Sequence, residues 1–182
     1  MYHRLRAPAL QPAAATLEFA TGETAMRFVD QLITVIKYIA LIGILAHVLG
    51  EALPRKWFHW DRFPYRAFPW EAGGRIYETM GIRRWKDRLP DKSKHTKKTF
   101  TKQMKGHDNP DGLIRFLQET CVAEFVHWCL LLLSFPLYSY VPTPFGAAVT
   151  VLYALSNVPF ICIQRYNRPR LLRLLNRRLN PQ

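Results

Sequence analysis

Residues 120–141 read TCVAEFVHWCLLLLSFPLYSYV, an apolar run whose only acidic or basic side chains are Glu124 and His127. A helix of about 20 apolar residues crosses the hydrocarbon core of a bilayer, which is about 30 Å thick. The run therefore predicts a transmembrane helix. Pro136 interrupts it, and transmembrane helices tolerate proline better than soluble helices do.

Two further apolar runs lie at residues 32–53 and 145–163, and the first is weakened by Lys37, His47 and Glu51. Three such runs predict an all-α membrane protein with about three transmembrane helices, forming a single membrane domain. The alternative is a basic globular protein. It is disfavoured because one core built from 182 residues would have to bury three such long helices completely.

Composition excludes two other classes of protein. The hydrophobic content of 49% and the aromatic content of 13% are too high for a disordered basic tail. The three cysteines are an odd number and all lie in apolar runs, which argues against a secreted disulfide-bonded domain.

Charges are segregated along the chain. Of its 26 Lys and Arg residues, 16 lie between the first two apolar runs and six follow the third. Positive residues flank transmembrane helices mainly on the cytoplasmic side. We therefore expect residues 54–118 and the C-terminal tail, residues 164–182, to be cytoplasmic and the N-terminus to lie outside. The first 25 residues lack the pattern of a cleaved signal.

The cytoplasmic segment 54–118 is rich in aromatic and basic residues, as in RKWFHWDRFPYRAFPW at residues 55–70. Trp and Tyr favour the headgroup level and Lys and Arg attract anionic lipids, so the composition predicts an interfacial segment. Nucleic acids could use the same residue types, but the flanking spans favour lipid, and we expect no nucleic-acid partner. Residues 75–80 predict a short helix, residues 92–105 a loop, and Asp111 the start of a helix that continues into the second span.

Glu124 and His127 are the first candidates for chemistry. Ionisable side chains at membrane depth are costly and usually mark function. Three residues apart on a helix, they share one face and lie about 4.5 Å apart along its axis. A carboxylate can orient an imidazole, which can then take a proton from a hydroxyl group. Two alternatives stay open: a purely structural pair, and a metal site. A di-metal carboxylate site needs the E-x-x-H pattern twice, so we expect no metal.

The end of the third run forms a second polar cluster, QRYNRPR at residues 164–170. Arginine and asparagine can hold a phosphate, a carboxylate or sugar hydroxyl groups. A positive flank of the span would explain the arginines but not Gln164 and Asn167. Asn157, inside the run, is a further candidate for lining a cavity. The tail that follows alternates leucine pairs with arginine, which is typical of an interfacial amphipathic helix.

Five ordered motifs carry a family resemblance: FPWE (68–71), GRIYE (74–78), GIRRWKDRLPD (81–91), ETCVAEFVHW (119–128) and IQRYNRPRL (163–171). Together they resemble the glycosyl-4,4'-diaponeurosporenoate acyltransferase family of small bacterial membrane proteins.

The resemblance implies location in a bacterial cell membrane and transfer of a fatty acyl chain to the primary hydroxyl of a carotenoid glucosyl ester. That reaction completes a staphyloxanthin-type pigment. The motifs add four candidates for substrate binding: Trp70, Trp85, Lys86 and Asp87. The sequence has no H-x-x-x-x-D motif, so His127 is the expected base.

From these observations we expect direct acyl transfer, without a covalent enzyme intermediate and without a cofactor. The donor would be an acyl thioester of coenzyme A or acyl carrier protein, and the acceptor a glycosylated carotenoid or similar glycolipid. His127 would be the base, and Glu124 would orient it. Arg165 or Arg168, with Gln164, would bind the donor phosphate or the oxyanion.

Two rival hypotheses remain. The first is a two-step transfer through Cys121, with His127 activating the thiol. The second is a non-catalytic membrane-anchored module that binds anionic lipid or a partner protein. A simple anchor has no need of Glu124 and His127 inside a span, which favours an enzyme.

Overall fold

The computed structural model describes residues 13–89 and 110–180, with side chains from residue 22 onward. Within these ranges the chain is helical and contains no strand, so the prediction of an all-α protein is confirmed. The long helices are α1 (Ala13–Ala52), α6 (Pro110–Ser134) and α8 (Pro144–Leu179). The short elements are η1 (Arg55–Trp57), η2 (Pro69–Gly74), α2 (Arg75–Thr79), α3 (Ile82–Trp85), η3 (Lys86–Arg88) and α7 (Leu137–Tyr140).

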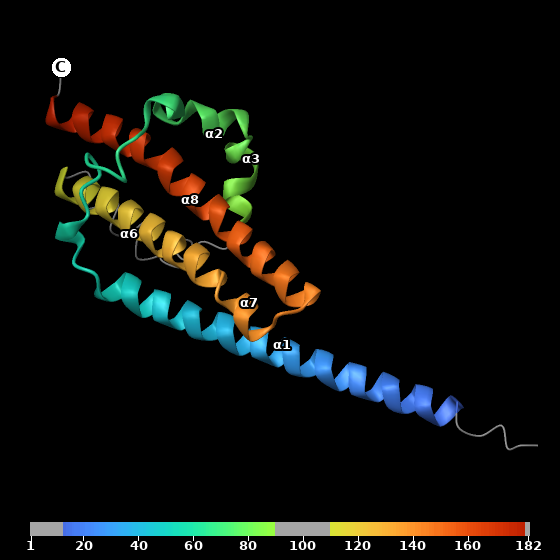
Figure 1. The fold of residues 1–182 in the computed structure, drawn as a ribbon. Helices are drawn as coiled ribbons and strands as arrows, with labels where there is room; N and C mark the ends of the chain where they lie inside the picture. The colour runs from blue at the N-terminus through green and yellow to red at the C-terminus, as the bar shows by residue number, and fades with distance from the viewer. Residues whose placement is uncertain (1–12, 90–109, 181–182) are drawn as a thin grey trace, which may run out of the picture.

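Three helical stretches are long and apolar enough to cross a membrane: Gly22–Ala52, Pro110–Tyr140 and Pro144–Leu179. They contain the three predicted apolar runs almost entirely. Large apolar side chains on all three stretches face outward, for example Ile44, Leu132 and Leu152, each about 62–66% exposed. Such an exposed apolar surface fits a lipid environment rather than water. The arrangement of the three helices is shown in Figure 1.

Helices α6 and α8 form an antiparallel pair and pack together more extensively than any other described elements (Figure 1). Pro136 ends the regular course of α6, and the short α7 leads into the connection to α8. Thr143 then caps α8, because its hydroxyl accepts a hydrogen bond from the Gly146 amide at 3.2 Å. A Cβ at Gly146 would lie 1.9 Å from the Val141 carbonyl oxygen, so only glycine allows this tight turn.

Helix α1 packs against α6 and α7. Val35 lies in one apolar cluster with Leu137 and Val141. The Tyr38 hydroxyl donates a hydrogen bond of 2.8 Å to the Leu133 carbonyl, near the end of α6. In Figure 1, the N-terminal part of α1 projects beyond the α6–α8 pair.

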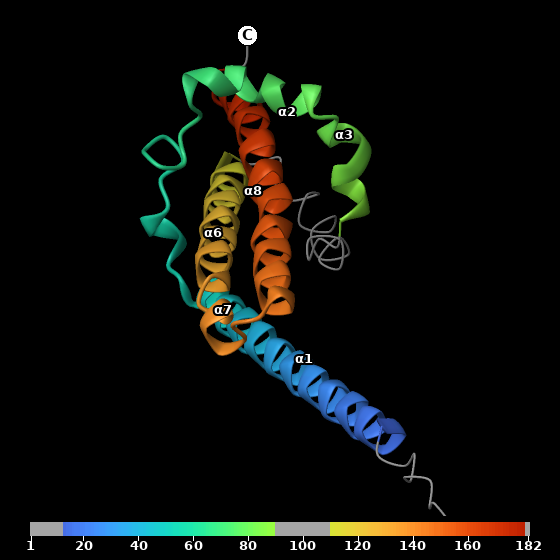
Figure 2. The same ribbon diagram turned by 45° about the vertical axis from the view of Figure 1, so that its right-hand side comes forward.

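Residues 53–89 follow α1; within them, α2 packs against α8, and Ile82 of α3 lies in one apolar cluster with Tyr166 of α8. These residues, which we call the wrapping segment, pass around the end of the α6–α8 pair that lies away from α7 (Figure 2). Arg55 fixes its start by a bidentate ion pair with Glu119 of α6, at 2.9 and 3.1 Å. Phe58 packs against Cys121 and Val122 of α6. The predicted short helix at residues 75–80 is confirmed as α2, and the predicted start of a helix at Asp111 agrees with α6.

The predicted cytoplasmic tail, residues 164–182, begins within α8, which runs without a break from Pro144 to Leu179 despite Pro159 and Pro169. The predicted loop at residues 92–105 lies outside the described residues.

Candidate active site

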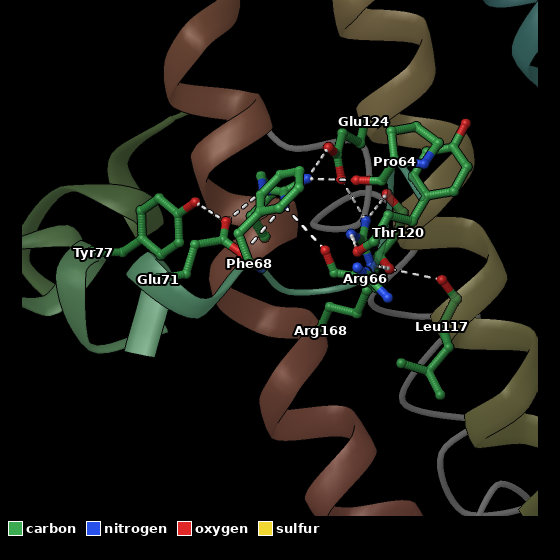
Figure 3. Close-up of polar contacts among 11 residues, drawn as sticks. Pro64, Arg66, Phe68, Glu71, Tyr77, Leu117, Thr120, Glu124 and Arg168 are labelled. Atoms are coloured by element: carbon green, nitrogen blue, oxygen red, sulfur yellow. Dashed lines mark hydrogen bonds and ion pairs between the residues drawn. The ribbon is translucent and has the colours of Figure 1, made fainter. Parts of the chain in front are cut away.

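Four charged side chains are buried where α6, α8 and the wrapping segment meet (Figure 3). They are Glu71, Glu124, Arg165 and Arg168, and none is more than 9% exposed. We call them the buried charge cluster. Two carboxylates balance two guanidinium groups, which lowers the cost of removing the charges from water. Their positions depend on α6, α8 and η2 together, so the cluster exists only in the folded chain.

Arg165 of α8 binds carboxylates on both η2 and α6. Its guanidinium donates to Glu71 at 2.5 and 3.1 Å and to Glu124 Oε1 at 2.7 Å. It also donates to the backbone carbonyls of Pro64 and Arg66 at 3.1 and 3.3 Å. A planar guanidinium with five donors can satisfy such a set, whereas a lysine ammonium cannot.

Arg168 lies one turn further along α8 and binds Glu124 from the other side. Its Nη2 donates to Glu124 Oε2 at 2.7 Å and to the Thr120 carbonyl at 3.2 Å. Its Nε donates to the Thr120 hydroxyl at 3.1 Å, and Nη1 donates to the Tyr65 carbonyl. Both Glu124 oxygens are therefore hydrogen-bonded to arginine.

Glu71 anchors the wrapping segment to the cluster. Besides Arg165, its carboxylate accepts hydrogen bonds from the Tyr77 hydroxyl and, at 2.6 Å, from the Phe68 amide. Burial raises the pKa of Glu71, but the hydrogen bonds from Arg165, Tyr77 and the Phe68 amide outweigh it, and the net pKa lies below the ordinary value. Glu71 is therefore a carboxylate at neutral pH.

Two tyrosines beside the cluster remain neutral. Burial, followed by the nearby Glu71 carboxylate, raises the pKa of Tyr77. Burial raises the pKa of Tyr65 to about 12. Neutral phenols keep their O–H groups as hydrogen-bond donors.

A small pocket opens beside the buried charge cluster, lined by Tyr65, Ala67, Glu71, Arg165, Arg168, Pro169 and Leu172. Its volume of about 10 Å³ is no more than that of one water molecule. A sugar or an acyl chain cannot enter it in this conformation. The cluster is therefore arranged to hold three elements together.

His127 lies one turn deeper on α6 and contacts α8. Its Nδ1 lies 3.0 Å from the Asn157 side-chain oxygen, and its ring stacks on Phe160 with centroids 4.6 Å apart. The Asn157 amide nitrogen donates to the Tyr153 carbonyl at 2.9 Å. That bond sets which way the amide points, so its oxygen faces His127 and Nδ1 must carry a proton. In the neutral ring, Nε2 is then the basic nitrogen.

The partners of the predicted pair thus differ from the expected ones. Glu124 was expected to orient His127, but both Glu124 oxygens are bound by arginine and Asn157 takes the orienting position at Nδ1. Arg165 or Arg168 was expected to bind the donor phosphate or the oxyanion. The two residues are 9% and 2% exposed and are used by Glu71, Glu124 and backbone carbonyls. Packing of α6 on α8 places both guanidinium groups against the Glu124 carboxylate and Asn157 against His127, and the wrapping segment adds a second carboxylate, Glu71, at Arg165.

The remaining predicted site residues on α8 are Gln164 and Asn167. Gln164 and Asn167 follow Phe160 by four and seven residues, so the three share one stripe of the helix. Both side chains are partly exposed, and neither hydrogen-bonds to any described residue.

The four candidates from the motifs lie in the wrapping segment. Trp70 is 63% exposed and stacks on Phe68. The Trp85 indole donates to the Met80 carbonyl at 3.2 Å, and the Lys86 ammonium lies over the Tyr166 ring, 5.6 Å from its centroid. Asp87 is exposed.

Sequence reasoning missed Glu71 as a member of the buried charge cluster and Tyr77 as its hydrogen-bond donor. Both lie inside quoted motifs, FPWE and GRIYE, and an acidic residue in an aromatic and basic segment is a signal that could have singled out Glu71. Within the described ranges no group of three His, Cys, Asp or Glu side chains could hold a metal ion. Cys121 of α6 is completely buried and packs against Phe58 of the wrapping segment.

Comparison with known proteins places these residues in a family context. The family model described as glycosyl-4,4'-diaponeurosporenoate acyltransferase matches residues 54–177. A glycosyl-4,4'-diaponeurosporenoate acyltransferase of Staphylococcus aureus (strain MRSA252) is 32% identical over 136 residues, covering 71% of this chain and 81% of that protein. The same-named protein of Staphylococcus aureus (strain bovine RF122 / ET3-1) is 31% identical with the same coverage. No solved structure matches the chain.

Proposed function

The chain belongs to the glycosyl-4,4'-diaponeurosporenoate acyltransferase family, and on that premise we propose that it moves a fatty acyl chain from an acyl thioester to a sugar hydroxyl. The acceptor is a glycosylated carotenoid or a similar glycolipid, held in the membrane by its apolar chain. The observation that carries the proposal is the orientation of His127 by Asn157. A histidine whose Nδ1–H is fixed by an acceptor presents Nε2 as a base.

The reaction proceeds in one transfer. Nε2 of His127 takes the proton of the acceptor hydroxyl as its oxygen attacks the thioester carbonyl. The tetrahedral intermediate collapses, the C–S bond breaks, and the imidazolium returns the proton to the leaving thiolate. The products are the ester and a free thiol, and no cofactor is consumed. Asn157 stabilises the imidazolium because its oxygen accepts the Nδ1–H bond throughout.

Gln164 and Asn167 are the proposed polar contacts of the substrates. They share a stripe of α8 with Phe160, which stacks on the His127 ring, and their side-chain amides have no hydrogen-bond partner among the described residues. We assign the Gln164 amide to the oxyanion and Asn167 to the sugar hydroxyls. An amide donor aimed at a developing oxyanion is worth about 10²- to 10³-fold in rate.

The buried charge cluster has a positioning role in this proposal. Glu124 lies one turn from His127 on α6, and Arg165 one residue beyond Gln164 on α8. Their ion pair of 2.7 Å fixes the register of the two helices, and that register brings His127 against Asn157. Glu124 therefore supports the base through the helix pair.

The site lies at the cytoplasmic end of the spans in the proposed topology. The basic wrapping segment and the end of α8 lie at the same end of the α6–α8 pair (Figure 2), and the positive-inside rule assigns that end to the cytoplasm. Acyl thioesters are made and kept in the cytoplasm, so the donor can reach His127 from that side.

Purified protein in neutral detergent provides the test. It is mixed with a labelled acyl thioester and a glycosylated carotenoid, and the ester is measured by mass spectrometry. Ester formed by the wild type and lost in His127→Ala supports the proposal. An inert wild type that remains folded and binds anionic lipid would instead favour the membrane-module hypothesis.

A further inference from the structure

A second group of charged side chains surrounds Tyr166, on the part of α8 that faces α2 and α3. The Arg170 guanidinium lies 3.7 Å above the Tyr166 ring and the Lys86 ammonium 5.6 Å from its centroid. The Arg83 Nε donates to the Tyr166 hydroxyl at 3.2 Å. We call Arg83, Lys86 and Arg170 the tyrosine-centred cations.

One carboxylate is shared between two of these cations. Glu78 accepts from Arg83 at 2.8 Å and from Arg170 at 2.5 Å. The surroundings add more positive charge, since residues 75–88 and 169–179 carry nine Lys or Arg residues and two acidic ones. The Arg83 side chain is 66% exposed, so the excess charge is presented at the surface. Such a surface attracts phosphate groups.

The position of the tyrosine-centred cations relates them to the proposed reaction. Arg170 follows Asn167 by three residues, so the two are neighbours on α8. Phe160, against the His127 ring, lies ten residues before Arg170, which is about 15 Å along the helix axis. An extended pantetheine chain can cover such a distance between a phosphate and a reacting thioester.

We propose that the tyrosine-centred cations bind the phosphate of the phosphopantetheine arm of the acyl donor. This inference rests on the proposed acyl transfer. It assigns the donor phosphate to Arg83, Lys86 and Arg170 in place of the buried Arg165 and Arg168. The arm then runs from Arg170 past Asn167 and Gln164 and presents the thioester to His127. Coenzyme A and acyl carrier protein share this arm, so the site serves either carrier.

The experiment uses two donors that differ by one phosphate. Acyl-4'-phosphopantetheine and acyl-pantetheine are compared in the purified full-length protein with the same acceptor. Wild type should show a lower KM for the phosphorylated donor. Lys86→Gln and the double variant Arg83→Gln/Lys86→Gln should raise that KM roughly 3- to 10-fold, with kcat and the KM for acyl-pantetheine little changed.

Lys56→Gln is the matched control. It removes the same charge from an exposed lysine in η1, outside the tyrosine-centred cations, and should leave both KM values unchanged. Assays with and without phosphatidylglycerol separate the donor phosphate from a lipid headgroup. If the variants lose only their response to phosphatidylglycerol, the site binds lipid and the inference is wrong.

Further outcomes distinguish a failure of this inference from a failure of the proposed function. Equal KM values for both donors in the wild type, or an equal rise for both donors in the variants, would overturn the inference while acyl transfer itself stands. If neither thioester is used at all, it is the proposed function that fails. A dependence on intact acyl carrier protein alone, with no response to the free phosphorylated arm, would place recognition on the carrier protein and also overturn the inference.

Discussion

The side-chain oxygen of Asn157 lies 3.0 Å from Nδ1 of His127, joining α8 to α6 inside the second and third spans. The two residues are 30 positions apart in the chain. Because the Asn157 amide nitrogen is held by the Tyr153 carbonyl, the contact determines which nitrogen of His127 carries the proton. The base proposed for acyl transfer thus depends on the pairing of the two helices.

Substitutions of His127 and Asn157 should distinguish the contribution of the base to kcat from the contribution of the residue that orients it. His127→Ala should lower kcat about 10²- to 10⁴-fold, because general-base catalysis is worth that much. Asn157→Leu removes the acceptor and should cost roughly 10- to 100-fold through misplacement of the ring. Asn157→Asp keeps an acceptor and should retain most of the activity. Equal losses in Leu and Asp variants of matched stability would contradict the orienting role.

Removing one partner of the buried charge cluster should destabilise the protein more than it affects the chemistry. Arg165→Gln removes the arginine that binds Glu71 and one of the two arginines that bind Glu124, and breaking a buried ion pair costs about 3–5 kcal/mol. Thermal unfolding in detergent measures the change, with Arg173→Gln as an exposed control. Glu124→Gln should lower stability too, but should reduce kcat less than His127→Ala does. A fully stable Arg165→Gln protein would argue against the anchoring role.

Cys121→Ala tests the two-step mechanism. The thiol is completely buried, so the direct mechanism predicts near-normal turnover and no acylated protein. Mass spectrometry of the intact chain after mixing with donor alone provides the measurement. A thioester trapped on Cys121, together with an inactive Cys121→Ala protein, would replace the direct mechanism with transfer through the cysteine.

Acidification should weaken the anchoring by Glu71. Its pKa is lowered in the folded protein, so its stabilising effect is present above the ordinary carboxyl pKa and is lost as the pH falls through the lowered value. Between pH 7 and pH 3, the unfolding temperature of the wild type should fall more steeply than that of Glu71→Gln. Parallel curves would show that Glu71 contributes no pH-dependent stability.

Paired cysteine labels should test the membrane topology. Thr79 lies in α2 and Ser139 in α7, at the end of the second span, and both are exposed. In a chain whose three native cysteines are replaced by alanine, Thr79→Cys should need a membrane-permeant reagent in intact cells. Ser139→Cys should react with an impermeant one. The reverse pattern would invert the proposed orientation. Carbonate washing should leave either variant in the membrane fraction.

The sequence alone was sufficient for the helical framework. Three apolar runs, each about 20 residues long, specify helices that can span a bilayer, because backbone polar groups at that depth must be hydrogen-bonded within the segment. Local signals also predicted α2 and the start of α6, since turn residues and helix starts act over a few positions. The family followed from ordered short motifs, which do not depend on knowing their contacts.

The partners of the charged residues were decided by tertiary structure. Spacing on one helix suggested that Glu124 orients His127, because residues three apart share a face. In the folded protein, Glu124 instead forms ion pairs with Arg165 and Arg168 of α8, and His127 contacts Asn157 of α8. Periodicity shows which face of a helix a residue occupies, but not which side chain from a distant segment reaches it. Such a contact forms only when the three elements bury their charges against one another, and its geometry is set by the neutrality and hydrogen bonding of the whole cluster.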